Sequence, residues 1–221
     1  MAHRNRTRVK ICCISSPAEA RLAIDLGADA LGLVGAMPSG PGVVADEQAA
    51  TIVRQVPPPI ATFMLTSETT VAGILAHHRR VLANTIQLVD AVPTGTYAQL
   101  RDALPMVSLV QVIHVTDERS VANALAAVAD GADALLLDSG NPSLNVKELG
   151  GTGRVHNWKI SRAIVDQSPV SVFLAGGLNP ANVRDAIAQV QPFGLDICSG
   201  VRTDGHLDAD KLRAFMLALR D

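Results

Sequence analysis

The stretch Gly131-Ala132-Asp133-Ala134-Leu135-Leu136-Leu137-Asp138-Ser139 decides how the chain folds. A run of large apolar residues is typical of a strand that is buried on both faces, as in a parallel sheet, and this run ends at a carboxylate. The same opening occurs about half a chain earlier, as Gly27-Ala28-Asp29-Ala30-Leu31-Gly32-Leu33. Two copies indicate one β–α unit used repeatedly. We therefore expect Asp138 at the carboxyl end of a buried strand.

Apolar, β-branched runs predict eight strands along the 221 residues, at Val9–Ile14, Ala30–Val34, Ala61–Leu65, Thr85–Val89, Val107–Val115, Ala134–Asp138, Val170–Ala175 and Leu195–Cys198. Helical spacing fills the intervals, at Pro17–Leu26, Asp46–Gln55, Thr69–Arg79, Glu118–Ala129, Asn157–Asp166, Pro180–Gln189 and Asp208–Leu219, and more weakly at Thr96–Ala103. Strict alternation implies parallel pairing, in an open doubly wound sheet or in a closed barrel. Eight units of about 27 residues favour a (β/α)₈ TIM barrel, with residues 1–221 as a single domain.

Local signals indicate where some of the helices begin and end. Ser16-Pro17 and Asn179-Pro180 each place a capping side chain before a proline, which suits the first helical position. His77-His78-Arg79-Arg80 closes a helix, where we expect these cationic side chains on a solvated face.

Composition excludes several classes of function. A net charge of −2 and 3% aromatic residues give neither a basic footprint nor a stacking platform for nucleic acid. The apolar run after the amino terminus is too short for a signal peptide or a membrane span, so we expect a cytoplasmic protein without a membrane partner. Three cysteines, two of them adjacent, show neither a disulfide framework nor the spacing of a metal site, so we expect free thiols and no metal.

The carboxyl ends of barrel strands are where catalytic side chains are expected. Strand alternation places Lys10 and Cys12 on one face of the first strand and Cys13 on the other. Asp196 lies on the eighth strand, which neighbours the first in a closed barrel, and is the predicted partner of Lys10. Judged from its residue type alone, Cys12 is a small buried hydrophobic residue, as most free cysteines are.

Glycine clusters follow the last three predicted strands, as Gly150-Gly151-Thr152-Gly153, Gly176-Gly177 and Ser199-Gly200. In such barrels, the loops after the seventh and eighth strands commonly bind a phosphate through backbone N–H groups. A single glycine pair would indicate only a tight turn. Three clusters on adjacent loops favour a phosphosugar site.

Five motifs, in this order along the chain, resemble phosphoribosylanthranilate isomerase, a family of tryptophan and hence aromatic amino acid biosynthesis. They are Val9-Lys10-Ile11-Cys12, the run ending at Asp138-Ser139, Gly150-Gly151-Thr152-Gly153 with Trp158 beyond it, Gly176-Gly177-Leu178-Asn179-Pro180-Ala181-Asn182-Val183, and Asp196-Ile197-Cys198-Ser199-Gly200-Val201. The likeness runs nearly end to end.

This resemblance implies an Amadori rearrangement that needs no cofactor, in which an N-linked aminoaldose phosphate becomes a 1-amino-1-deoxyketose phosphate. Asp138 would be the general acid that protonates the ring oxygen, and Cys12 the general base that takes the C2 proton. A cationic Lys10 would favour the Cys12 thiolate. The remaining expected substrate or phosphate contacts are Gly151, Thr152, Gly153, Gly176, Gly177, Asp196, Ser199 and Gly200.

Departures from the family pattern concern the aromatic half of the substrate. The loop after the second strand lacks the family's carboxylate-binding arginine and has Met37-Pro38-Ser39-Gly40-Pro41-Gly42-Val43 instead, while Cys13 replaces a glycine. Arg202 stands where the family usually has glutamate, so we consider it a substitute cation for the carboxylate or phosphate. Its alternative role is a solvent-facing residue paired with Asp204 or Asp208.

These observations predict an aldose–ketose isomerase that acts on phosphoribosylanthranilate, as a monomer or homodimer. Two alternatives stay open at this point. One is the same chemistry on a different phosphoribosyl amine, and the other is a non-catalytic paralogue that only binds a phosphosugar.

Overall fold

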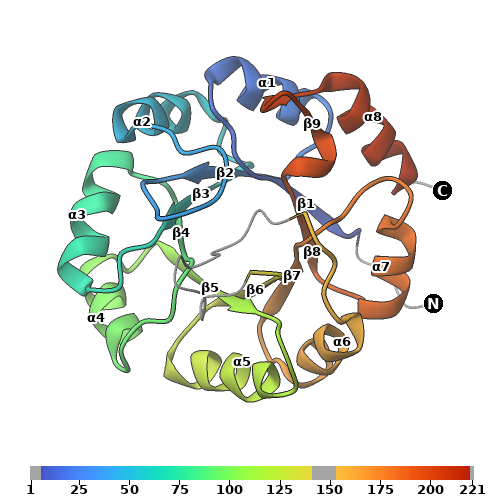
Figure 1. Ribbon diagram of the computed structural model, residues 1–221. Coiled ribbons are helices and arrows are strands. Elements are labelled where there is room, and N and C mark those ends of the chain that lie inside the picture. Colours follow the sequence, from blue (N-terminus) through green and yellow to red (C-terminus); the bar gives the residue numbers. More distant parts are fainter. Residues whose placement is uncertain (1–5, 141–152, 220–221) are drawn as a thin grey trace.

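Eight parallel strands close into a barrel because the first strand pairs with the last (Figure 1). The computed structural model describes residues 6–140 and 153–219. The strands are β1 (Arg8–Ile11), β2 (Ala30–Val34), β3 (Ala61–Thr66), β4 (Thr85–Leu88), β5 (Ser108–His114), β6 (Ala134–Asp138), β7 (Ser171–Leu174) and β8 (Gly194–Ile197). The predicted (β/α)₈ barrel is therefore confirmed.

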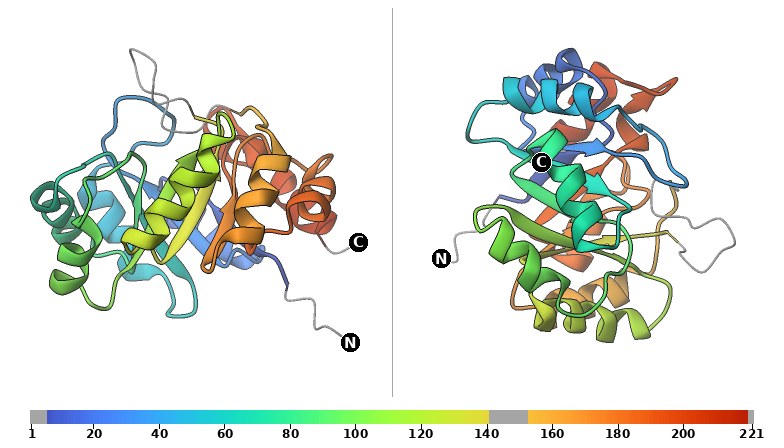
Figure 2. Two further views of the ribbon diagram at one scale, coloured as in Figure 1. Left: turned by 90° about the horizontal axis from the view of Figure 1, so that it is seen from below. Right: turned by 90° about the vertical axis from the view of Figure 1, so that its left-hand side faces the viewer.

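Helices surround this barrel, as the end-on and side views show (Figures 1 and 2). They are α1 (Pro17–Asp25), α2 (Asp46–Gln55), α3 (Val71–Val81), α4 (Thr96–Ala103), α5 (Arg119–Asp130), α6 (Trp158–Gln167), α7 (Val183–Val190) and α8 (Ala209–Ala218). Between β8 and α8 the chain adds elements that the sequence pattern did not predict: a short 3₁₀ turn, η1 (Ser199–Val201), and a two-stranded hairpin, β9 (Arg202–Thr203) and β10 (His206–Leu207). No helix in the described parts of the chain is long and apolar enough to cross a membrane.

Side chains of each strand alternate between the inside of the barrel and the helix layer. On β6, Leu135 and Leu137 belong to the large apolar cluster beneath the helices, whereas Leu136 belongs to the cluster inside the barrel. All three leucines are at most 1% exposed. This double burial explains why the strand has a continuous apolar run. Asp138 follows that run at the carboxyl end of the strand.

Lys10 is the unusual residue of the barrel interior because it is a fully buried cation. Its Nζ lies 2.8 Å from Asp196 Oδ1 and 5.2 Å from the centroid of the Phe63 ring. Gly32 provides the space, since a Cβ there would lie 3.0 Å from this Nζ and 2.9 Å from the Cys12 sulfur. The Lys10–Asp196 pairing predicted from strand adjacency is confirmed.

Opposing effects act on the two charges of this pair. Burial lowers the pKa of Lys10, but attraction to Asp196 and to Cys12 outweighs it and raises that pKa above its ordinary value. Burial raises the pKa of Asp196 despite the opposing effect of Lys10. The lysine is therefore a fixed positive charge beneath Cys12.

Of the two predicted helix starts, one is confirmed and one is wrong. Ser16 caps α1 by accepting a hydrogen bond from the Glu19 N–H, with Pro17 at the first helical position, as predicted. In contrast, α7 begins at Val183 and not at Pro180. The intervening segment forms a loop instead, in which the Asn182 side chain accepts from the Asn179 N–H at 2.9 Å and donates to the Gly177 carbonyl at 2.9 Å.

The expectation of a solvated face at the end of α3 is wrong for the two histidines. His77 and His78 are each 5% exposed. His77 Nδ1 lies 2.9 Å from Thr66 Oγ1 and its Nε2 lies 3.2 Å from Asp46, while His78 Nε2 lies 2.9 Å from the Ala83 carbonyl. Helical periodicity could not reveal these partners because Thr66 and Asp46 lie on neighbouring elements and Ala83 lies beyond the end of the helix.

The buried ion pair leads to a stability prediction. Lys10→Met is expected to lower the free energy of unfolding by about 3–5 kcal/mol, because it leaves the Asp196 carboxylate buried without its partner. Lys10→Met/Asp196→Leu is expected to be more stable than Lys10→Met, since it removes that uncompensated charge. Urea unfolding followed by circular dichroism measures both differences. A loss of stability in the double variant equal to the sum of the losses in Lys10→Met and Asp196→Leu would contradict the pairing.

Candidate active site

A pocket opens at the carboxyl ends of the strands. Its lining combines Cys12 after β1 and Asp138 at the end of β6 with glycines of the last loops. The residues predicted from sequence that line it are Cys12, Asp138, Gly153, Gly176, Gly177, Asp196, Ser199 and Gly200. Gly151 and Thr152 lie outside the described residues. Lys10 does not line the pocket, since its ammonium is bound to Asp196 deeper in the barrel.

Asp138 combines burial with hydrogen bonding through one of its oxygens. The residue is 9% exposed, and its Oδ1 accepts from the Ser139 N–H at 2.7 Å and from the Ser139 hydroxyl at 3.4 Å. One oxygen of the carboxylate is thus held by Ser139, the next residue in the chain. This arrangement fixes an acidic group at the rim of a partly dry pocket.

His156 is a neighbour of this carboxylate that sequence analysis missed. Burial lowers the pKa of His156 to about 4, against the attraction of Asp138, which raises it. Its Nε2 lies 2.7 Å from the Ser161 hydroxyl, and its buried Nδ1 has no hydrogen-bond partner among the described residues. The imidazole is therefore neutral at neutral pH. No motif surrounds His156, so only the folded loop could identify it.

Gln87 is a second polar group whose role the sequence did not reveal. It lies on β4, is 3% exposed and lines the pocket. Its buried Oε1 accepts no hydrogen bond within the described residues. A buried acceptor without a donor is costly, so this oxygen is suited to a hydroxyl or N–H group of a bound molecule.

Cys13 faces the same pocket as Cys12, which corrects the expectation that strand alternation would turn it away. The strand ends at Ile11, and Cys13 has φ = +64°, in the left-handed region. A non-glycine residue in this region costs on the order of 1–3 kcal/mol. Alternation therefore fails here because the backbone leaves the extended conformation one residue after Cys12, whose N–H still donates to the Ile197 carbonyl at 2.8 Å.

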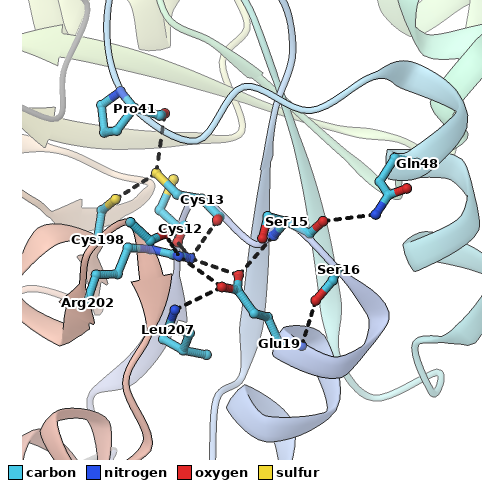
Figure 3. A network of polar contacts seen from close by, with 11 residues as sticks. Cys12, Cys13, Ser15, Ser16, Glu19, Pro41, Gln48, Cys198, Arg202 and Leu207 are labelled. Carbon is cyan, nitrogen blue, oxygen red and sulfur yellow. Dashed lines mark hydrogen bonds and ion pairs between the residues drawn. The ribbon is translucent and has the colours of Figure 1, made fainter.

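Arg202 holds the Cys12–Cys13 segment in place, as Figure 3 shows. Its guanidinium lies 3.2 Å from each carboxylate oxygen of Glu19 and donates to the Cys12 and Cys13 carbonyls. A further bond reaches the Gly205 carbonyl at 2.8 Å. The side chain is only 7% exposed.

This environment corrects the surface pairing considered for Arg202. Its partner is Glu19 of α1, and neither Asp204 nor Asp208 is the paired carboxylate. The predicted substrate contact is not supported, because the described pocket lining does not include Arg202 and its donors are directed to the chain itself. The sequence could not reveal this partner, since Glu19 lies 183 residues away.

Glu19 connects the network to the hairpin after β8. Its carboxylate accepts from the Leu207 N–H at 2.8 Å and the Ser15 N–H at 3.0 Å, besides Arg202 (Figure 3). Burial raises the pKa of Glu19, but the bonds from Arg202, Leu207 and Ser15 outweigh it and hold this pKa below its ordinary value. The ionised carboxylate therefore connects the first β–α unit of the barrel to the segment after β8.

The glycine loops after β6, β7 and β8 pack against one another at the pocket. A Cβ on Gly200 would lie 2.2 Å from the Leu178 carbonyl oxygen, and one on Gly177 would lie 2.8 Å from backbone atoms of Arg154 and Val155. Gly177 also has φ = +63°. These contacts require glycine and allow the three loops to meet, so that their backbones line one concave surface.

The opposite side of the pocket is formed by the loop after β2. Met37, Ser39, Gly40 and Pro41 contribute to the lining, and the loop returns to the barrel through a bridge between Val34 and Val43. Among the described residues that line the pocket, none is arginine, lysine or histidine. Within residues 6–140 and 153–219, no group of three or more His, Cys, Asp or Glu side chains is arranged to hold a metal ion.

Comparison with known proteins agrees with this geometry. A family model described as N-(5'phosphoribosyl)anthranilate (PRA) isomerase matches residues 9–218. The N-(5'-phosphoribosyl)anthranilate isomerase of Desulforudis audaxviator is 35% identical, with 97% of this chain and 98% of the relative covered. That of Halobacterium salinarum is 34% identical, with 95% and 94% covered.

Solved structures show the same likeness. Phosphoribosyl anthranilate isomerase from Thermotoga maritima has a TM-score of 0.82 at 29% identity, over 97% of this chain and 98% of that one. The fold and the pocket define a (β/α)₈ barrel with a thiol, a carboxylate and a set of glycine loops at its mouth. With the matches above, the chain belongs to the N-(5'-phosphoribosyl)anthranilate isomerase family.

The Glu19 network leads to a pH-dependent stability prediction. Because the pKa of Glu19 is lower in the folded than in the unfolded chain, its contribution to stability is present above the unfolded value, near 4.5, and is lost as the pH falls through the folded value. The stability deficit of Glu19→Gln is therefore expected to be largest at neutral pH and to shrink at acidic pH.

Urea unfolding at a series of pH values between about 3 and 7 measures this deficit. Glu47→Gln serves as the control, since Glu47 is an exposed glutamate of α2. A deficit that is independent of pH, or that is equally large in the control, would contradict the assignment.

Proposed function

We propose that this chain performs the isomerase reaction of tryptophan biosynthesis, from N-(5'-phosphoribosyl)anthranilate to 1-(o-carboxyphenylamino)-1-deoxyribulose 5-phosphate. The observation that carries the proposal is a single pocket that combines a thiol, a carboxylate and glycine loops in a member of this family. A related phosphoribosyl anthranilate isomerase has been solved in complex with reduced 1-(o-carboxyphenylamino)-1-deoxyribulose 5-phosphate. A different phosphoribosyl amine and a purely binding paralogue are not favoured.

In the first step, Asp138 acts as general acid. It donates its proton to the ring oxygen of the ribose, and the C1–O bond breaks to give an open-chain Schiff base. The position of Asp138 at the end of β6, in the lining of the pocket, supports this role, because a general acid must lie within hydrogen-bond reach of the group that it protonates. The neutral His156 beside it adds no competing positive charge.

In the second step, Cys12 acts as general base and removes the C2 proton. The resulting enolamine then tautomerises to the ketone. The buried charge of Lys10 supports this role, because it lies close enough to Cys12 to attract negative charge at that residue. The bonds from Arg202 to the Cys12 and Cys13 carbonyls hold the base in place.

The phosphate is bound by backbone N–H groups of the glycine loops. Gly153, Gly177 and Gly200 line the pocket on one side, and the contacts between their loops support a preformed anion site. Gln87 accepts a hydrogen bond from a sugar hydroxyl or the anthranilate N–H, which supplies the donor that its Oε1 lacks. The aromatic ring lies toward Met37 and Pro41, on the loop after β2.

Three further proposals concern the protein as a whole. The chain functions as one domain, supported by the closure of all eight strands in one barrel. It acts in the cytoplasm, where the precursors of amino acid synthesis and reduced thiols are expected. It is a monomer or a homodimer, which sedimentation equilibrium would distinguish.

The acid–base assignment predicts the effect of two conservative substitutions. Asp138→Asn and Cys12→Ser are each expected to lower kcat by about 10²-fold or more, the scale of a positioned general acid or base. The loss of anthranilate-type fluorescence on turnover of phosphoribosylanthranilate measures the rate. Cys13→Ser is the matched control and should lose much less, because hydrogen bonds to Cys12 and Cys198 and burial raise the pKa of Cys13. Equal losses at Cys12 and Cys13 would refute the assignment.

The anion site predicts competitive inhibition by inorganic phosphate. Gly177→Ala is expected to weaken this inhibition about tenfold or more, because the added Cβ must displace the loop from backbone atoms only 2.8 Å away. Gly95→Ala is the matched control, since Gly95 also has a positive φ but has no atom within 4 Å of the added Cβ. Phosphate that inhibits both variants and the wild type equally would contradict the site.

A further inference from the structure

Two thiols that the proposed mechanism does not use lie in contact at the pocket. Cys13 follows β1 and Cys198 follows β8, the two strands that close the barrel. Their sulfur atoms are 2.6 Å apart, and both residues line the pocket (Figure 3). The Cys13 sulfur also lies 3.6 Å from the Pro41 carbonyl of the loop after β2. A thiol pair thus occupies the junction of three loops around Cys12.

The two thiols differ in exposure. Cys13 is 4% exposed, whereas Cys198 is only partly buried and is open to the pocket. Cys198 is therefore the sulfur that a reagent in the pocket reaches first. Cys13 is the more buried partner, and its sulfur lies 2.6 Å from that of Cys198.

The two thiols also differ in acidity. The hydrogen bond with Cys13 lowers the pKa of Cys198, and burial opposes this effect. The nearby Arg202 cation lowers this pKa further. Hydrogen bonds to Cys12 and Cys198, together with burial, raise the pKa of Cys13. Cys198 is therefore the more acidic thiol of the pair, and Cys13 the less acidic one. This division of roles is that of an attacking and a resolving cysteine.

We propose that Cys13 and Cys198 form a redox-active dithiol, which low-molecular-weight disulfides convert into an intramolecular disulfide at the mouth of the barrel. The Cys198 thiolate attacks one sulfur of the oxidant, so that a mixed disulfide forms and one small thiolate leaves. Cys13 then loses its proton and attacks the Cys198 sulfur. The second small thiolate leaves and takes up that proton, so one disulfide is reduced and one is formed.

Backbone geometry favours this pair over the one that includes Cys12. The left-handed conformation of Cys13 turns its side chain toward the end of β8, where it meets Cys198. A disulfide bond is about 2.05 Å long, so the two sulfur atoms need to approach only slightly. Cys12 keeps its thiol and is left as the single free cysteine.

Oxidation has a consequence for the reaction, and this consequence rests on the proposed function. The bond joins Cys13, next to Cys12, to Cys198, which directly precedes Ser199 and Gly200. It therefore connects the base to the phosphate loop. It also removes the Cys13 thiol from the Pro41 carbonyl and from Cys12. We expect activity to fall about tenfold or more, since a displacement of about 1 Å at a catalytic group is this costly.

The experiment treats the folded, full-length protein with hydroxyethyl disulfide, quenches it in acid and alkylates it in denaturant. Before oxidation, all three cysteines of the chain are expected to be alkylated. Afterwards we expect one alkylated cysteine, a mass lower by two hydrogen atoms before alkylation, and full recovery with dithiothreitol. Three alkylated cysteines after oxidation would overturn the proposal.

Single variants identify the two partners and their roles. Cys12→Ser is expected to form the disulfide as the wild type does, because it retains both partners. Cys13→Ser is expected to stop at the mixed disulfide and carry one mercaptoethanol adduct, whereas Cys198→Ser forms no intramolecular disulfide. A disulfide that still forms in Cys198→Ser would overturn the assignment, as would an adduct-free Cys13→Ser.

Activity separates this inference from the proposed function. Turnover of phosphoribosylanthranilate by the reduced wild type tests the function, whereas the thiol count tests the dithiol whether or not the protein turns over. The ratio of oxidised to reduced activity then tests the link between them. A disulfide that forms completely while this ratio stays at one would overturn the expected effect on activity.

Discussion

The pairing of β1 with β8 is the constraint on which the rest of the structure depends. It closes the barrel and aligns Lys10 with Asp196, residues that lie at opposite ends of the chain. Just beyond that register, it also brings Cys13 against Cys198. The buried ion pair, the thiol contact and the position of Cys12 are all consequences of this single strand pairing.

The same closure explains why a structural network lies directly beneath the proposed base. Arg202, which follows β8, reaches Glu19 of α1 and the carbonyls of Cys12 and Cys13. Carbonyls at a strand end have lost their ladder partners, so a guanidinium with several donors satisfies groups that would otherwise be left unpaired. The charge at position 202 therefore stabilises the segment that carries Cys12.

The two halves of the pocket have different physical character. The side formed by the last three loops is made of glycine backbone, where close packing excludes side chains and suits a phosphate. The side formed by the loop after β2 presents Met37 and Pro41, without a cation among the described lining residues. Binding energy is thus expected to come mainly from the phosphate end, with the aromatic half held by apolar contact.

The sequence by itself determined the elements and their order, because burial on both faces leaves continuous apolar runs and glycine punctuates them. It also determined that Cys12, Asp138 and the glycine loops meet at one end, since all follow strands of one parallel barrel. Tertiary structure alone decided the partners of Arg202, the direction of Cys13 and the acceptor left open at Gln87. These depend on the left-handed backbone at Cys13 and on contacts between residues far apart in the chain, which a local pattern does not encode.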